Sequence, residues 1–270
     1  MAMGGAESKE ADRQLRSASL NGVILPSSME LFFDPSWSKF KLHLLHSFSE
    51  PVYTFNLPEG WWGSLILHGG PTVDHPLLAA VRNTGESGTG NLVTLPPLGP
   101  GQEVLKEKMS RRRKGWMEIW SFAVPVPVPD RAGEEKVTAT TTTTTTTRVE
   151  RFEWVSTRGK EVKDLHEWGR GWKLRRVATT YPDAHADKGW DEDDEDDDEG
   201  DAAAYEYEEL HADNEVLAVW ADAKGLKSRK AAKFEFVNSG ATGELGEAWA
   251  LMAVVSFVRV WQRYMQIIVV

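Results

Sequence analysis

The sequence predicts a mainly β fold, an antiparallel β-sandwich or β-barrel, from three observations. Short segments with strand character recur along its 270 residues, and glycine and proline separate them. No helical crossovers lie between these segments, which argues against a parallel, doubly wound sheet. One strongly apolar helix is expected near the carboxyl terminus, and twelve Trp and ten Phe residues are enough for a substantial core.

The first clear strand lies at residues 51–57, where alternation places Tyr53, Phe55 and Leu57 on one face. Comparable segments are expected at 64–70, 77–83, 91–97, 171–178, 215–222 and 232–238. A strand at 115–124 would place three aromatic residues on a common side: Trp116, Trp120 and Phe122. Residues 149–165 resemble a hairpin with its turn at 157–159.

The last element is predicted to be a helix over about Glu244–Gln266, with Thr242 or Gly243 as its N-cap. Between Ala248 and Val258 every residue except Ser256 is apolar, and a helix that is apolar on all sides must be buried on all sides.

A membrane-spanning helix needs about 20 apolar residues, and this run is about half that length. Arg259 and Arg263 also interrupt the run, although a tail anchor would be feasible if these arginines extended toward the membrane surface. Burial in protein is the preferred interpretation. It predicts a sheet curled into a barrel with the helix passing through its interior.

Three glycines, Gly240, Gly243 and Gly246, precede this helix. Their spacing is not that of a dinucleotide-binding loop, no second βαβ strand follows, and no Lys-Ser or Lys-Thr completes a P-loop. A sharp reversal of the chain into a barrel needs positive φ angles and close backbone approach, which glycine permits. The glycines are therefore interpreted as a hinge.

The carboxyl-terminal segment NSGATGELGEAWALMAVVSFVRVW resembles the tubby-like superfamily, as do WVSTRGKEV (154–162), GWKL (171–174) and VWAD (219–222). The resemblance is closest to the LURP-one-related branch and to uncharacterised tubby C-terminal-like proteins of filamentous fungi, and it covers about residues 36–265. It implies a closed barrel of about twelve antiparallel strands around a buried hydrophobic C-terminal helix.

The resemblance also implies functions. Tubby proteins bind phosphoinositides through basic side chains on the barrel surface and can act in the nucleus. The related phospholipid scramblases often carry acylated cysteines, and this chain has no cysteine. The scramblase activity is therefore disfavoured.

The expected domain organisation is a disordered leader (1–35) and a single tubby-like barrel domain (36–270). The barrel domain would carry two low-complexity insertions, Thr-rich at about 128–148 and acidic at about 182–212. Residues 191–201 hold ten carboxylates, which equals the net charge of −10, so the rest of the chain is neutral. This acidic segment is either a solvated loop or a site that attracts a basic protein partner.

The candidate lipid-headgroup site is a run of six cations within nine residues. These are Lys106, Lys108, Arg111, Arg112, Arg113 and Lys114. The run is expected on an exposed loop or strand end, where it could bind phosphoinositides or other anionic phospholipids. The alternatives are a nuclear-import signal, a nucleic-acid patch and a solvated loop that protects a sheet edge. Lys173, Arg175 and Arg176 would extend the cluster if the fold brings them near.

Other classes of function have little support in the sequence. Specific nucleic-acid binding is disfavoured because the body has no net positive charge. No nucleophile elbow is present, and His43 and His46 would project to opposite faces of a strand, so neither catalytic residues, a cofactor nor a metal is expected.

The leading hypothesis is a non-enzymatic tubby-like module that binds anionic lipid headgroups. The alternative is a protein-interaction or nuclear regulatory module that uses residues 191–201. A cytoplasmic location without a transmembrane segment is expected, with the nucleus or a membrane periphery as alternatives.

Overall fold

The computed structural model describes residues 5–20, 22–34, 41–46, 51–84, 90–128, 146–165, 170–177, 214–223 and 229–268. The threonine run at 140–147 lies almost entirely outside these ranges, and the acidic segment 191–201 lies wholly outside them. The predictions about these two segments therefore remain predictions.

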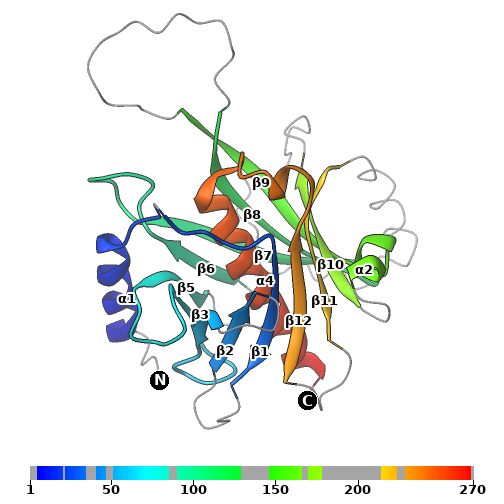
Figure 1. Ribbon diagram of the computed structural model, residues 1–270, viewed down its shortest axis with the longest axis horizontal. Coiled ribbons are helices and arrows are strands. Elements are labelled where there is room, and N and C mark those ends of the chain that lie inside the picture. Colours follow the sequence, from blue (N-terminus) through cyan, green and yellow to red (C-terminus); the bar gives the residue numbers. More distant parts are fainter. Residues whose placement is uncertain are drawn as a thin grey trace, which may run out of the picture.

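Twelve antiparallel strands form a closed barrel in which each strand pairs with its neighbours in the chain and β1 pairs with β12 (Figure 1). The strands are β1 (Ser28–Phe33), β2 (Lys41–Leu45), β3 (Pro51–Asn56), β4 (Leu65–His68), β5 (Leu77–Thr84), β6 (Gly90–Leu95), β7 (Leu105–Lys114), β8 (Met117–Pro127), β9 (Thr147–Thr157), β10 (Gly171–Val177), β11 (Val216–Asp222) and β12 (Lys230–Phe236). The predicted antiparallel β-barrel is confirmed, and the sandwich alternative is excluded.

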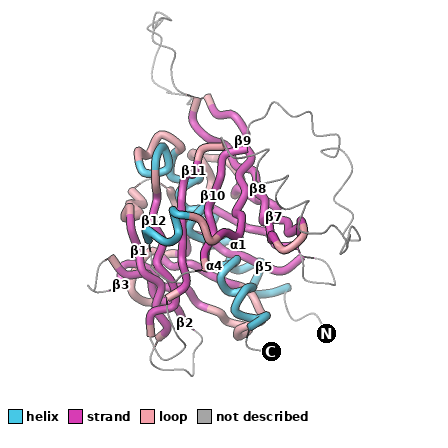
Figure 2. Tube along the Cα trace, turned by 90° about the vertical axis from the view of Figure 1, so that its right-hand side faces the viewer, coloured by secondary structure: helices cyan, strands magenta, loops and turns pink. Residues whose placement is uncertain are grey.

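The C-terminal helix α4 (Gly246–Ile268) runs through the barrel, with strands around it in both views (Figure 1 and Figure 2). Residues 251–262 are all buried. Phe257 packs on Trp220 and Phe234 of the barrel wall, with ring centroids 5.4 and 5.1 Å away. The strands of the closed barrel cover this part of the helix, so the predicted burial in protein is confirmed.

The chain enters the barrel through the 3₁₀ helix η2 (Asn238–Ala241) and the predicted glycine hinge. Gly243 and Gly246 have φ angles of +81° and +80°, and a Cβ on Gly240 would lie 2.1 Å from the carbonyl oxygen of Leu217. The hinge interpretation is thus supported at all three positions. The helix begins at Gly246 rather than Glu244, and Thr242 caps η2 instead of α4.

The predicted leader contains ordered structure. Strand β1 closes the barrel, and helix α1 (Gly5–Ser17) packs Ala11 and Leu15 against Leu77 and Val104. The prediction of disorder is wrong for these elements. Their short sequences carry too little apolar periodicity to be detected alone, and contacts with distant residues stabilise them.

The predicted hairpin at 149–165 is also wrong. Strand β9 ends at Thr157 and is followed by helix α2 (Lys160–Leu165), and the strands that pair with β9 are β8 and β10. Val162 and Leu165 of α2 pack on Val219 and Ala221 of β11, on the outside of the barrel. This packing favours a helical turn over the strand that local composition indicated.

The two ends of the barrel differ, and we name them from the direction of α4. The entry end is where α4 begins at Gly246, and the exit end is where it finishes at Ile268. Because consecutive strands are antiparallel, their connections alternate between the ends. The connections β8–β9 and β10–β11, which contain the two predicted insertions, leave from the entry end, whereas the β7–β8 turn lies at the exit end.

Candidate functional site

All six cations of the predicted headgroup site lie on strand β7 rather than on a loop. Backbone pairing to both β6 and β8 holds this charged segment in extended form, and such tertiary context overrides its weak strand propensity. Met109 is in the core and Arg111 is opposite the core residue Trp120, so odd-numbered residues face the helix side and even-numbered residues face outward. The predicted cluster is therefore divided between two faces.

Three of the six cations are paired with carboxylates. Lys106 Nζ lies 2.7 Å from Asp12 of α1, Arg111 donates to Glu118 at 2.8 Å, and Arg112 donates to Glu153 at 2.8 Å. Two exposed cations, Lys108 and Arg113, form no ion pair with any residue in the described part of the chain. The predicted site is thus partly neutralised by the protein itself.

The fold adds new cations on the outer face of β7–β10. Arg175 is the cross-strand neighbour of Glu153, and Lys173 is the neighbour of Val155. Glu153 is almost fully buried, and Arg151 approaches it at 3.5 Å in addition to Arg112. Glu153 is the one carboxylate among the outward-facing residues of these four strands. We call this surface the basic face. Its cations are Lys108, Arg112, Lys114, Arg151, Lys173 and the almost fully buried Arg175; Lys106 also faces outward but is paired with Asp12.

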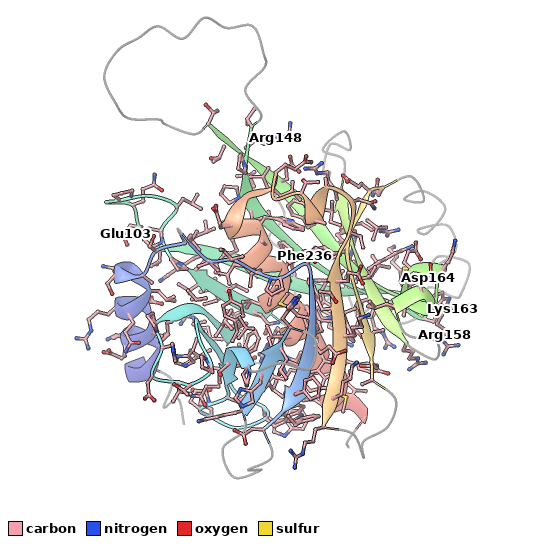
Figure 3. The ribbon with its side chains drawn as sticks, in the orientation of Figure 1. Glu103, Arg148, Arg158, Lys163, Asp164 and Phe236 are labelled. Atoms are coloured by element: carbon pink, nitrogen blue, oxygen red, sulfur yellow. The ribbon has the colours of Figure 1, made fainter. Side chains whose placement is uncertain are left out.

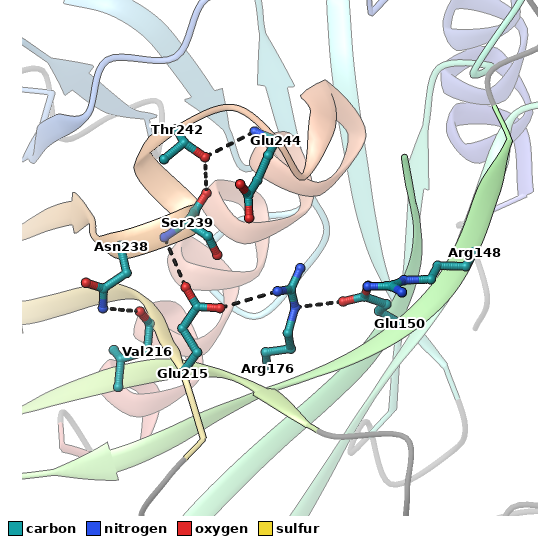
Figure 4. A network of polar contacts seen from close by, with 9 residues as sticks. All are labelled: Arg148, Glu150, Arg176, Glu215, Val216, Asn238, Ser239, Thr242 and Glu244. Carbon is teal, nitrogen blue, oxygen red and sulfur yellow. Dashed lines mark hydrogen bonds and ion pairs between the residues drawn. The ribbon is translucent and has the colours of Figure 1, made fainter. Parts of the chain in front are cut away.

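Arg176, the third residue of the predicted extension, faces the other way and belongs to the entry end (Figure 4). It lies 2.8 Å from Glu150 and 3.3 Å from Glu215. Glu150 also accepts from Arg148, and Glu215 accepts from the backbone N–H of Ser239 in η2 at 3.1 Å. This network joins β9, β10 and β11 to the segment that leads into α4.

The β7–β8 hairpin ends in a two-residue turn, Gly115-Trp116. Gly115 has a φ of +55°, as the first central residue of a type II′ turn requires. Trp116 is 49% exposed, whereas Trp120 and Phe122 are buried, so the prediction of a common aromatic side is wrong for Trp116. The reason is its place in the turn, beyond the strand positions that pack on the helix.

The surroundings of this turn are basic. Arg113 and Lys114 precede it, and the pairing of β6 with β7 reaches only as far as Met109. The backbone N–H of Glu118 donates to Ser156 Oγ at 3.0 Å, which attaches the hairpin to the end of β9. Arg158 follows β9 directly and projects from the molecule near α2 (Figure 3). We call Arg113, Lys114 and Trp116 the hairpin tip.

Sequence reasoning missed the exposure of Trp116 and the convergence of Arg151 with Arg112. The exposure of Trp116 could have been predicted from the local sequence, because a glycine followed by one residue between two extended segments is typical of a two-residue hairpin turn. No local pattern predicts that Arg112 and Arg151 converge, because strand β8 lies between their strands and brings them close only in the folded protein.

Inside the exit end, a buried arginine of α4 closes the barrel. The Arg259 guanidinium donates to Asn91 Oδ1 at 2.7 Å, to the Gly63 carbonyl at 2.9 Å, and also to Gln262 and Asn83. Its acceptors are amide and carbonyl oxygens rather than carboxylates. Burial lowers the pKa of Arg259 to about 9, with a further contribution from the charge of Arg263. Because the N–H groups of the Arg259 guanidinium donate to acceptors within the protein, we assign this arginine a structural role.

Two acids have raised pKa values. Burial raises the pKa of Glu107 on β7 to about 7 and that of Asp222, at the end of β11, to about 7. Arg170 and a hydrogen bond with Tyr264 of α4 oppose the shift at Asp222. These raised pKa values make both acids sensitive to pH in the folded state.

Two further observations concern classes of site. Within the described ranges, no group of three or more His, Asp or Glu residues could hold a metal ion. His43 contacts Thr54 and Asp34, and His46 contacts the Ser28 carbonyl. Of the helices that the structure describes, none has both the length and the apolar character needed to cross a bilayer.

No protein-family model matches this chain, and neither curated proteins nor solved structures gave a match. The resemblance to the tubby-like superfamily therefore stays a prediction from the sequence.

Proposed function

We propose that this chain is a non-enzymatic module of the tubby-like type that binds anionic phospholipid headgroups, phosphoinositides among them. The binding surface would comprise the basic face and the hairpin tip. The closed barrel around a hydrophobic C-terminal helix supports the tubby-like assignment, because that is the architecture expected from the resemblance.

The observation that carries the lipid proposal is the charge imbalance of the basic face. The outward-facing positions of the described strands β7–β10 carry one carboxylate, Glu153, and the six cations of the basic face, of which Arg175 is almost fully buried. Exposed cations near a membrane surface contribute about 1 kcal/mol each to the binding of anionic lipids. Arg112 and Arg151 are held by Glu153, and such fixed guanidinium groups are suited to phosphate oxygens.

The test is vesicle co-sedimentation at physiological salt. It would compare neutral phosphatidylcholine vesicles with vesicles that contain 20% phosphatidylserine or a few per cent phosphoinositide. The test variant is Lys108→Ala/Arg113→Ala/Lys114→Ala, which spares the ion-paired arginines. Removing three cations should weaken partitioning by about 3 kcal/mol, or roughly 100-fold.

The matched control is Lys9→Ala/Arg13→Ala/Arg16→Ala on α1, which changes the net charge equally. Its exposed ion pairs add little to stability, so the variant should fold and bind as the wild type does. If the wild-type protein did not bind anionic vesicles, or if the β7 variant and the α1 control variant lost binding equally, the proposed surface would be wrong.

A further inference from the structure

We infer that Trp116 is the residue through which this protein enters the membrane interface, so that the exit end of the barrel near β7 and β8 faces the bilayer. This inference rests on the proposed function and adds an orientation and an anchoring residue to it.

The exposure of Trp116 is the first argument. The tryptophans on the described strands, Trp120, Trp154, Trp172 and Trp220, are buried, but 49% of the turn residue Trp116 is exposed to solvent. An indole ring combines a large apolar surface with one N–H donor, and tryptophan is accordingly enriched where proteins meet the headgroup region of bilayers.

The second argument is the position of the ring at the end of a projecting hairpin. No described strand pairs with residues 111–114 on the β6 side, and the turn follows directly after them. A tight two-residue turn holds the ring on a short, hydrogen-bonded support. Little conformational freedom would be lost when the ring enters the interface.

The third argument is charge. Arg113 and Lys114 directly precede the turn, and Arg158 follows the adjoining strand β9, to which the hairpin is bonded through Ser156. The nearest carboxylate of the hairpin, Glu118, is already occupied by Arg111 and by the Trp120 indole N–H at 2.9 Å. The cations would contact anionic headgroups, while the apolar ring would enter the boundary between the headgroups and the acyl chains.

Trp62 provides a matched comparison at the same end of the barrel. It is 57% exposed, but it lies in the β3–β4 connection near Glu59, without neighbouring basic residues in the segment 57–64. An orientation with the hairpin tip against the membrane predicts that Trp62 stays in water.

The first measurement is co-sedimentation with vesicles of phosphatidylcholine and 20% phosphatidylserine. Trp116→Ala should weaken partitioning about tenfold, since the ring contributes roughly the burial of one large apolar side chain. Trp62→Ala should leave it unchanged.

The second measurement reports location directly. Because the chain has no cysteine, Trp116→Cys and Trp62→Cys each provide a unique thiol for an environment-sensitive fluorophore. Anionic vesicles should shift the emission of the probe at position 116 to the blue and leave the probe at position 62 unchanged.

The outcomes separate this inference from the proposed function. If anionic vesicles bind the wild type and Trp116→Ala equally, and the probe at 116 does not shift, the inference is wrong while headgroup binding stands. If wild-type protein binds no vesicles, both are wrong. If the probe at 116 shifts with protein concentration alone, a second copy of the chain covers the ring and the inference is overturned.

Discussion

The two ends of the barrel hold their buried or half-buried arginines with different partners. Each end must close over a helix that is apolar on all sides. At the entry end, Arg176 is neutralised by Glu150 and Glu215, and the network extends to η2 (Figure 4). At the exit end, Arg259 is held by amide side chains and backbone carbonyls, and the hairpin beside it carries exposed cations. Among the described residues, the Arg176 charge at the entry end is paired with carboxylates, whereas Arg113 at the exit end forms no ion pair, so the exit end is the better candidate to attract an external anion.

The largest expected effect comes from disrupting the helix that both ends enclose. Val254→Asp places a carboxylate at a fully buried position of α4. An unpaired buried charge costs several kcal/mol against a typical stability of about 5–15 kcal/mol, so the domain should unfold. Circular dichroism and thermal melting would measure this, with Val254→Ala as the control for lost volume. A soluble Val254→Asp protein that melts cooperatively at the wild-type temperature would contradict the central position of the helix.

The second prediction compares the two closures directly. Arg259→Met should destabilise the protein by about 3–5 kcal/mol, because it leaves the buried Asn91 Oδ1 and the buried Gly63 carbonyl without their donor. Arg176→Met should cost less, about 1–3 kcal/mol, because Glu150 keeps Arg148 and Glu215 is about one-third exposed.

Urea denaturation of both variants at pH 7 would measure this difference. Equal destabilisation, or a larger loss from Arg176→Met, would show that the distinction between the two ends is wrong.

The third prediction concerns pH and a carboxyl group at the exit end. Burial raises the pKa of Asp222 from 3.8 to about 7, so the folded state favours the protonated carboxyl. The stability that Asp222 contributes is therefore full below pH 3.8, declines as pH rises through the window from about 4 to 7, and stays low above it. Asp222→Asn should remove this decline and stabilise the protein at pH 8 by at most about 4 kcal/mol.

Melting temperatures of wild type and Asp222→Asn between pH 4 and pH 8 would test this prediction. The two curves should meet near pH 4 and diverge as pH rises. Glu107→Gln serves as a second probe, because its carboxyl also has a pKa raised to about 7 by burial. Parallel curves for wild type and Asp222→Asn would contradict the assignment of the pH dependence to Asp222.

Much of the fold was visible in the sequence because its residues follow simple periods. Tyr53, Phe55 and Leu57 alternate and all lie in the core, as predicted. Strand β7 was not visible. Its inward positions include Arg111 and Arg113 near the exit end, and its outward positions are basic as well, so no apolar alternation marks it as a strand.

The candidate site was predicted only in part. The six cations were found from their density in the sequence, but their division between two faces and their partners Asp12, Glu118 and Glu153 were not. Arg112 and Glu153 are 41 residues apart, and no local pattern reports a contact over that separation. The exposure of Trp116 depends on a turn whose position becomes evident only when β7 is recognised as a strand.

The sequence by itself determined that α4 is enclosed in a barrel. A helix segment that is apolar on every side must be buried on every side, its apolar run is too short to span a bilayer, and the elements expected around it were strands. Tertiary structure alone decided which cations are neutralised and which remain exposed. Electrostatic contacts depend on distances of a few ångströms between side chains, and strand pairing sets those distances between residues that are remote in the chain.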